Sequence, residues 1–293
     1  MRGKLALPLV LALVGCKAQV EGQSSDGSVG DGSIDDDAAG DAAPLGPWGT
    51  PTKVTGASDP TIQEDDGTLS YSQLEIVFAR QNAADNGRKD LYWASRTTPQ
   101  GTFGTPIKLD LSLTGSAEET PRFSRDDLTL YFASNRGGGT LDIYSITRGA
   151  TGTPFTGQGT TVLGVATGSL EKWFAPCGNN RYLVILGADV AEGTLPNPPT
   201  VVASLSTADT ETGTFITEDC LTAYWASVTG GANTIYTSTR ISPTDPWLPP
   251  TVVMDFAALG GEQSDPWISP DQRTFALTSD VTGNQNDIYI STR

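Results

Sequence analysis

The stretch SRDDLTLYFASNRGGGTLDIYSITR, residues 124–148, joins an acidic turn, an aromatic strand, a glycine-rich turn and a second aromatic strand that ends in arginine. A diverged copy, SPDQRTFALTSDVTGNQNDIYISTR, occupies residues 269–293. Short apolar runs between Gly, Asn and Asp turns predict antiparallel strands. The recurrence of this hairpin indicates a repeat architecture.

Five units share one order of features. An acid comes first, followed by a first strand, an aromatic strand and a last strand that ends in Ser or Thr and then Arg. The units span residues 58–96, 118–148, 170–206, 210–240 and 263–293. The third unit lacks the final arginine. Further pieces between the units each predict one more strand, at an edge position where proline is tolerated. These pieces are residues 47–54, 102–111, 154–163 and 246–256.

Four strands per unit, repeated about every 50 residues, are typical of a β-propeller. We therefore expect an all-β fold with a single propeller of five blades. One blade should have only three strands, because the segment after residue 206 is too short for the additional piece. The N-terminal strand in residues 47–54 should complete the last blade and so close the ring without free sheet edges.

The segment FSRDDLTLYFASNRGGGTLDIY, residues 123–144, resembles the PD40 repeat, the WD40-like unit of TolB-type propellers. The resemblance extends over residues 47–293 and implies the propeller fold. It implies no particular function, because binding proteins and hydrolases share this fold. TolB-type proteins usually have six blades after a separate α/β domain. Five units and no such domain are apparent here, so a role in a Tol complex is not implied.

The N-terminal MRGKLALPLVLALVGC has a basic start and a short apolar run, typical of a secretory signal and too short to span a bilayer. Its LVGC end resembles the bacterial lipobox, which implies cleavage before Cys16 and acylation of that residue. The alternative is a plain signal peptide with a chance cysteine. We expect a signal peptide over residues 1–15, a lipidated tether over residues 16–46 and the propeller over residues 47–293.

The tether consists mainly of Gly, Ser, Ala and Asp, so it buries too little apolar surface to order itself. The residue after Cys16 is Lys17 rather than the aspartate that retains lipoproteins at the inner membrane of enteric bacteria. By that analogy we expect an exported protein, anchored by its lipid in the bacterial outer membrane, on the periplasmic side or at the cell surface.

The composition excludes several classes of function. With 34 acidic and 18 basic residues the net charge is −16, which argues against nucleic-acid partners. The chain has no histidine, so it has no Ser-His-Asp or Cys-His catalytic system and no His-ligated zinc. We expect no cofactor, although a structural calcium ion with oxygen ligands stays open. Glycosidase chemistry based on carboxylates also stays open.

Each unit carries an acid just before its first strand. If these acids occupy equivalent positions, they form a ring of carboxylates at the axis that could hold a cation or a basic peptide. Alternatively they accept hydrogen bonds from loop amides or pair with the arginines that end the units. The acids are Asp59, Glu119, Glu171, Glu211 and Asp265, and the arginines are Arg96, Arg148, Arg240 and Arg293.

The first strands align large side chains at one position, namely Thr61, Arg122, Trp173, Phe215 and Trp267. Packing between blades is one interpretation, because both faces of a blade contact neighbouring blades. The other is that Arg122, Trp173 and Trp267 reach a pocket at the mouth of the channel that suits a sugar.

Cys177 and Cys220 fall on the first turns of adjacent units, and an exported compartment permits a disulfide between them.

The expected function is that of a membrane-anchored lipoprotein whose propeller binds a protein or glycan partner in the cell envelope without catalysis. The alternative is a propeller-type glycoside hydrolase that uses carboxylates, and a third possibility is an envelope scaffold. The non-catalytic interpretation is preferred at this point because the acids recur in every unit, as structural residues do, whereas a catalytic set should differ between blades.

Overall fold

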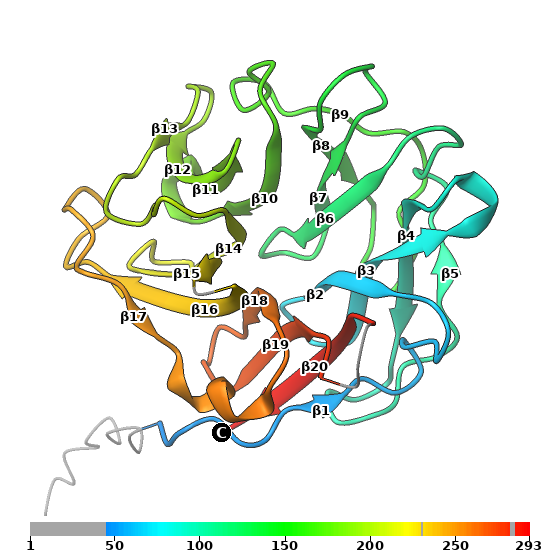
Figure 1. Cartoon of the computed structure of the whole chain (residues 1–293). Helices are drawn as coiled ribbons and strands as arrows, with labels where there is room; N and C mark the ends of the chain where they lie inside the picture. Colours follow the sequence, from blue (N-terminus) through cyan, green and yellow to red (C-terminus); the bar gives the residue numbers. More distant parts are fainter. Residues whose placement is uncertain (1–44, 230, 282–284) are drawn as a thin grey trace, which may run out of the picture. The chain divides into compact units, whose positions relative to one another are not determined.

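The computed structural model describes residues 45–229, 231–281 and 285–293. Five four-stranded antiparallel sheets form a ring around a central axis, as the repeats predict (Figure 1). The predicted signal peptide, Cys16 and nearly all of the tether lie outside the described residues. Within the described residues, no helix is long and apolar enough to cross a membrane.

The strands of each blade follow one another from the axis outward. Blade 1 contains β2 (Glu64–Leu69), β3 (Glu75–Asn82), β4 (Arg88–Ser95) and β5 (Ile107–Lys108). Blade 2 contains β6 (Glu118–Phe123), β7 (Thr129–Ser134), β8 (Asp142–Thr147) and β9 (Thr160–Thr161). Blade 3 contains β10 (Glu171–Pro176), β11 (Arg181–Leu186), β12 (Asp189–Thr194) and β13 (Thr200–Val201).

Blade 4 contains β14 (Glu211–Ile216), β15 (Thr222–Thr229), β16 (Ala232–Thr239) and β17 (Thr251–Val252). Blade 5 contains β18 (Gln263–Ile268), β19 (Thr274–Ser279), β20 (Asp287–Thr292) and, as its outer strand, β1 (Thr52–Lys53). The short 3₁₀ helices are η1 (Ala83–Asp85), η2 (Gly178–Asn180) and η3 (Met254–Leu259).

The N-terminal strand closes the ring, which confirms the prediction made from the order of the repeats. In β1, Thr52 pairs with Ile290 and Lys53 with Tyr289 of β20. Two backbone hydrogen bonds extend the pairing on either side, from Gly49 N to Thr292 O (3.0 Å) and from Val54 N to Ile288 O (2.8 Å). The ends of the propeller are thereby joined within one sheet.

The prediction of one three-stranded blade is wrong, since all five sheets have four strands. In blade 3 the outer strand β13 is only two residues long and pairs Val201 with Ala191 and Thr200 with Glu192. Because every outer strand in this propeller is equally short, the few residues after the third unit's hairpin suffice.

Every innermost strand contains a β-bulge near its middle. In each, the second residue and the fifth residue pair regularly with the next strand, and the register shifts between them. The third residue adopts a positive φ of 51–59° in all five blades. These third residues are Asp66, Thr120, Trp173, Gly213 and Asp265. The bulges therefore turn one residue of each blade out of the regular alternation of the strand.

The arginines at the ends of the units stabilise the blades rather than pairing with a ring of acids. Each stacks on an aromatic ring from the segment that leads to the outer strand, and its Nε donates to a carbonyl of the first turn. The distance from the guanidinium carbon to the ring centre is 4.3 Å for Arg96 on Phe103, 4.4 Å for Arg148 on Phe155, 4.0 Å for Arg240 on Trp247 and 3.9 Å for Arg293 on Trp48. The carbonyls belong to Gln73, Asp127, Cys220 and Gln272.

Blade 3 has Leu195 in place of this arginine, and a disulfide ties it to blade 4. Cys177 and Cys220 form this bond, with their Cα atoms 5.5 Å apart.

The hydrophobic core lies between the blades, where residues such as Phe78, Phe132 and Trp225 are fully buried. The axis itself is therefore lined by the innermost strands, and these position the candidate site.

Candidate active site

A cluster of four charged side chains and one tryptophan lies at the end of the axis where the innermost strands begin. It consists of Asp65 and Asp66 of β2, Trp173 of β10, Asp265 of β18, and Lys89, the second residue of β4. Asp66 and Asp265 are 199 residues apart in sequence, yet the backbone N–H of Asp66 donates to Asp265 Oδ2 over 3.2 Å. The ring of blades brings them together.

The indole of Trp173 bridges two of these carboxylates. Its Nε1–H lies 3.0 Å from Asp66 Oδ1 and 2.8 Å from Asp265 Oδ1. Because both oxygens lie within 3.0 Å of one nitrogen, they are closer together than the carboxyl groups of an inverting glycosidase, which stand about 6.5–9.5 Å apart. The bridge thus excludes the inverting spacing for these two oxygens and allows the shorter spacing of a retaining pair, about 5–5.5 Å.

Two lysines contact acidic side chains in and beside the cluster. Lys89 Nζ lies 2.6 Å from Asp65 Oδ2 and 3.6 Å from Asp66 Oδ2. Lys172 Nζ lies 2.5 Å from Glu119 Oε2 and 5.0 Å from the ring of Trp173. The lysine side chains are 22% and 19% exposed, whereas Asp66 and Asp265 are only 5% and 4% exposed. The lysines are therefore more exposed than these two carboxylates.

The two bridged carboxylates differ in their ease of ionisation. Burial and the neighbouring charge of Asp66 raise the pKa of Asp265 to about 6. Burial also acts on Asp66, but attraction by Lys89 and Lys172 and hydrogen bonds from Thr120 and Trp173 outweigh it and lower the pKa of Asp66. Burial and the charge of Asp66 raise the pKa of Asp65. Carboxyl pairs whose pKa values are pushed apart are typical of an acid and its partner base or nucleophile.

The local backbone explains why these side chains meet. Asp66, Trp173 and Asp265 have φ values of 56°, 51° and 55°, a left-handed conformation that is uncommon for residues other than glycine. Such strain persists only where the surrounding structure enforces it, and it is frequent at functional sites. Only two of the five third residues are acids, whereas four of the five first residues are glutamates.

The first residue of the innermost strands has a structural role. It is Glu64, Glu118, Glu171 or Glu211 in four blades, and each of these is fully buried. Each carboxylate accepts a hydrogen bond from a backbone N–H of the preceding loop, contributed by Asp59, Leu113, Thr167 and Thr207 respectively. Glu171 and Glu211 therefore hold loops and take no part in the cluster.

The five acids aligned from the sequence do not occupy equivalent positions, so they form no ring. Asp59 lies in a loop outside β2 and accepts from the N–H and hydroxyl of Thr61. Glu119 is a second residue and Asp265 a third residue of their strands, while Glu171 and Glu211 are first residues. The sequence alignment shifts blades 1 and 3, and it takes a second residue in blade 2 and a first residue in blade 4.

The aligned large side chains are likewise divided between two levels of the axis. Trp173 belongs to the carboxylate cluster, whereas Arg122 and Trp267 are fifth residues of their strands and lie further along the axis, and Thr61 lies outside β2. Trp267 is fully buried and packs on Phe215 and Tyr71, as expected of a packing residue.

Sequence reasoning missed Asp65, Asp66 and Lys89. The available signal was the run EDDG at residues 64–67, in which three acids precede a glycine, a pattern that recurs in no other unit. Within the described residues, no group of three or more His, Cys, Asp or Glu side chains has the geometry of a metal site.

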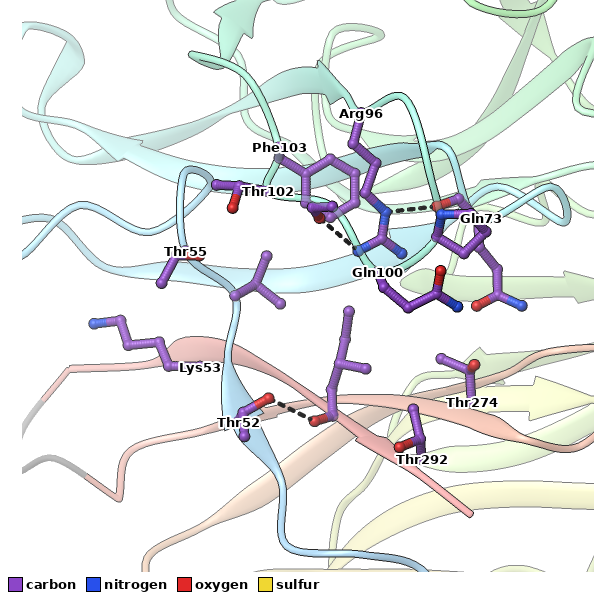
Figure 2. Close-up of a pocket in the computed structure, with 14 residues that line it drawn as sticks. Thr52, Lys53, Thr55, Gln73, Arg96, Gln100, Thr102, Phe103, Thr274 and Thr292 are labelled. Carbon is purple, nitrogen blue, oxygen red and sulfur yellow. Dashed lines mark hydrogen bonds between the residues drawn. The ribbon is translucent and has the colours of Figure 1, made fainter.

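A cavity of about 240 Å³ lies at the seam between the closing strand β1 and blade 1, away from the carboxylate cluster (Figure 2). Thr52, Gln73, Arg96 and Thr292 are among the polar side chains that line it, and Arg96 Nε donates to Gln73 O over 2.8 Å. Its lining contains no carboxylate. This cavity therefore offers no acid or nucleophile for glycosidic bonds.

No protein-family model and no curated protein matches the chain. Solved propellers do match it. An endo-arabinase from Bacteroides thetaiotaomicron is 10% identical with a TM-score of 0.57 and coverage of 80% of this chain and 95% of that one. The catalytic domain of a GH62 α-L-arabinofuranosidase from Coprinopsis cinerea is 11% identical, with a TM-score of 0.53 and coverage of 85% and 97%. A TolB-like protein from Agrobacterium tumefaciens is 15% identical, with a TM-score of 0.50 and coverage of 74% and 69%.

These similarities establish the five-bladed propeller fold and include a TolB-like structure among the neighbours. They also correct the functional expectation. Most of the similar structures are glycoside hydrolases rather than binding proteins, which contradicts the non-catalytic, non-enzymatic interpretation and favours its alternative. The argument from recurring acids also fails, because Asp66 and Asp265 occupy a strand position that is acidic in only two of the five blades.

Proposed function

We propose that this chain is a glycoside hydrolase whose active carboxylates are Asp66 and Asp265. The observation that carries the proposal is the pair of carboxylates bound to one indole N–H at the entrance of the axis, with opposite pKa shifts. The arabinan- and arabinofuranoside-cleaving propellers among the structural neighbours support this choice of reaction.

The proposed roles follow from the charges around each group. Lys89 and Lys172 favour the ionised form of Asp66, which attacks the anomeric carbon and forms a glycosyl-enzyme bond as the glycosidic bond breaks. Asp265 holds a proton up to about pH 6 and donates it to the leaving oxygen. In the second step Asp265 removes a proton from water, which displaces Asp66 and releases the sugar with its configuration retained.

Substrate binding needs to move only Lys172, whose ammonium lies 5.0 Å from the centre of the Trp173 ring, while Lys89 keeps its contacts with Asp65 and Asp66. Displacement of Lys172 from the ring of Trp173 would free an aromatic face on which a sugar can stack. Long lysine side chains move easily, so this opening needs no rearrangement of the blades.

The test is hydrolysis of 4-nitrophenyl glycosides, including the α-L-arabinofuranoside, and of arabinan and xylan oligosaccharides. We expect Asp66→Asn and Asp265→Asn each to lower kcat by about 10²–10⁴ on the substrate that the wild type cleaves. Asp110→Asn is the matched control, since Asp110 is exposed and outside the cluster. The proposal is wrong if the wild type cleaves no substrate, or if both cluster variants keep full activity.

The pH profile gives a second test on the same substrate. Because Asp265 must be protonated to donate, kcat should fall as the pH rises through about 6. Asp265→Asn should retain cleavage only of glycosides with a good leaving group. The kcat of this residual cleavage should no longer fall as the pH rises through about 6. An unchanged alkaline limb in the variant would assign the acid role to another group.

We also propose that Cys16 is acylated and anchors the enzyme in the bacterial envelope. The lipobox-like LVGC and the acidic, Gly- and Ser-rich tether support this proposal. Multiple acyl chains suffice to hold a protein without a spanning helix, at about 0.8 kcal/mol per buried CH₂. We expect the expressed wild type to partition with membranes and Cys16→Ala to become soluble; membrane partitioning of the variant would contradict acylation.

A further inference from the structure

A buried arginine crosses the axis beneath the carboxylate cluster. Arg122 of β6 is 3% exposed, and its guanidinium reaches from blade 2 to blades 4 and 5. There Nη2 donates to Thr214 O (3.1 Å) and Pro266 O (3.5 Å), and the guanidinium carbon lies 5.2 Å from the centre of the Phe215 ring. All these partners are uncharged.

The other deeply buried arginines of this propeller have carboxylate partners. Arg136 pairs with Glu118, Arg148 with Glu75 and Arg240 with Glu192, and their side chains are 8%, 3% and 1% exposed. Within the described part of the chain, Arg122 forms no ion pair, and its Nε and Nη1 have no hydrogen-bond partner. Burial lowers the pKa of Arg122 to about 10, so the side chain stays charged at neutral pH. An uncompensated buried charge of this kind is strongly destabilising.

Two other unpartnered donors occupy the same strand position in blades 1 and 5. Thr68, Arg122 and Trp267 are the fifth residues of β2, β6 and β18, as their pairing with the second strands shows. Thr68 Oγ1 and Trp267 Nε1 are buried and have no hydrogen-bond partner among the described residues. Indole and guanidinium N–H groups can only donate, so this level of the axis suits an acceptor with negative charge.

The nearest carboxylates are already bound elsewhere. Asp66 and Asp265 attract the guanidinium from the cluster above, but their oxygens accept hydrogen bonds from Trp173, and Lys89 lies 3.6 Å from Asp66. Neither lies within ion-pair distance of Arg122 in the described structure. Asp66 and Asp265 therefore act on Arg122 only from a distance, and its Nε and Nη1 stay open to an anion from outside the chain.

A cleft of about 310 Å³ lies at the opposite end of the axis, among the turns that follow the innermost strands. Its lining includes Phe215, the ring on which the Arg122 guanidinium lies, but not Arg122 itself. At the rim the exposed Arg125 stands 3.8 Å from Glu218. A small solute that enters here must pass the Phe215 ring to reach Arg122, and it does not meet Asp66 or Asp265, which are absent from the lining.

We propose that Arg122 is the centre of a binding site for one small monovalent anion, either a halide or the carboxylate of a small organic acid. The anion accepts hydrogen bonds from Nε and Nη1 of Arg122 and supplies the counter-charge that the fold lacks. This site is independent of the glycosidase proposal, because it uses neither Asp66 nor Asp265 and lies on the far side of them from the lysines.

Thermal unfolding of the purified chain in sodium chloride and in sodium gluconate of equal ionic strength tests the site. A ligand that binds only the folded state raises the Tm, and at ten times its Kd we expect a rise of about 3–6 °C. Sodium formate in place of chloride distinguishes the two sources: a rise with formate alone assigns the site to carboxylates, and a rise with chloride to halides.

The variant Arg122→Met should lose the anion-dependent rise, while Arg125→Met at the exposed rim should keep it. If Arg122→Met fails to fold, crystals of the wild type grown in sodium bromide test the site instead. We expect an anomalous bromide peak in contact with the Arg122 guanidinium. The proposal is overturned if the wild-type Tm is the same in chloride, formate and gluconate, if Arg122→Met responds as the wild type does, or if bromide and formate are both absent from Arg122 in the crystals.

Discussion

The first and third residues of the innermost strands include acids of similar chemistry in different surroundings. Glu171, a first residue, accepts hydrogen bonds from the N–H and hydroxyl of Thr167 in its own loop. Asp265, a third residue, shares the indole of Trp173 with Asp66 from another blade. The residue type alone does not separate the structural acid from the candidate catalytic acid; the partner does.

Glu171 leads to a prediction about stability and pH. Burial, together with the nearby Asp142, raises its pKa to about 7 from its ordinary value of 4.5. Between these two pH values the folded state holds a proton that the unfolded state has lost, so stability falls as the pH rises through this window. Glu171→Gln cannot ionise and should be more stable than the wild type at pH 8, by about 1–3 kcal/mol, with little difference at pH 4.

Urea unfolding at both pH values measures this difference, and the exposed Glu262→Gln is the matched control. The side-chain amide of the Glu171→Gln variant would still accept from the Thr167 N–H, so the loop should keep its geometry. A variant that is less stable than the wild type at pH 8 would show that the carboxylate is ionised in the folded protein and needed in that form.

At the scale of the element, a clamp made of one arginine holds each regular blade. The arginine that ends the third strand reaches the first turn with its Nε and covers an aromatic ring near the outer strand. Four blades contain this clamp, and its geometry varies little between them. Blade 3 has lost it, and the Cys177–Cys220 disulfide connects this blade to blade 4 instead. A typical disulfide contributes about 2–4 kcal/mol, enough to offset one missing clamp.

Arg96 gives the clearest test of the clamp because it has no carboxylate partner in the described structure. Its guanidinium donates to Gln73 O (2.8 Å) and Gly101 O (3.3 Å) and stacks on Phe103, as Figure 2 shows. A lysine ammonium lacks the planar fork of a guanidinium, so it cannot lie flat on the ring while it keeps both hydrogen bonds. Arg96→Lys should therefore lower the free energy of unfolding by about 1–2 kcal/mol.

The control for Arg96→Lys is Arg88→Lys, since the Arg88 side chain is 38% exposed and its pair with Asp85 lies at the surface. That change should cost less than about 0.5 kcal/mol. Equal losses in the two variants, measured by urea unfolding, would mean that the clamp contributes no more than a surface contact.

At the scale of the whole molecule, closure of the ring makes the five blades interdependent. Trp48, just before β1, packs edge-on against Phe275 of blade 5 with ring centres 5.2 Å apart, and Arg293 covers it from the last strand. Ser291 Oγ donates to Gly49 O over 2.6 Å. These contacts join the two ends of the described chain, so their loss exposes sheet edges at both.

Trp48→Ala should destabilise the propeller by about 3–5 kcal/mol, the usual cost of removing a buried aromatic side chain. Because closure concerns the whole ring, unfolding should remain a single transition with a lower midpoint. Thr52→Ala, an exposed change in β1 itself, is the control and should cost less than about 0.5 kcal/mol. A stable blade 5 that melts separately from the other blades would contradict the interdependence.

The sequence by itself determined the blade count and the closure of the ring. Both follow from a local pattern, the spacing of short strands and turns, and from the order of pieces along the chain. The candidate disulfide was visible for the same reason, because Cys177 and Cys220 occupy equivalent turns of neighbouring repeats. The four-stranded blade 3 was missed because a two-residue outer strand leaves almost no periodic signal.

Only the tertiary structure decided which acids meet. The sequence alignment displaced the first strands of blades 1 and 3 relative to the other blades, so Asp66, Trp173 and Asp265 were not aligned with one another. Their contacts join residues about 90–200 positions apart, across the axis of a closed ring. The pKa differences that distinguish their roles arise from burial and from the lysines that the ring places beside them, and neither is encoded in any single repeat.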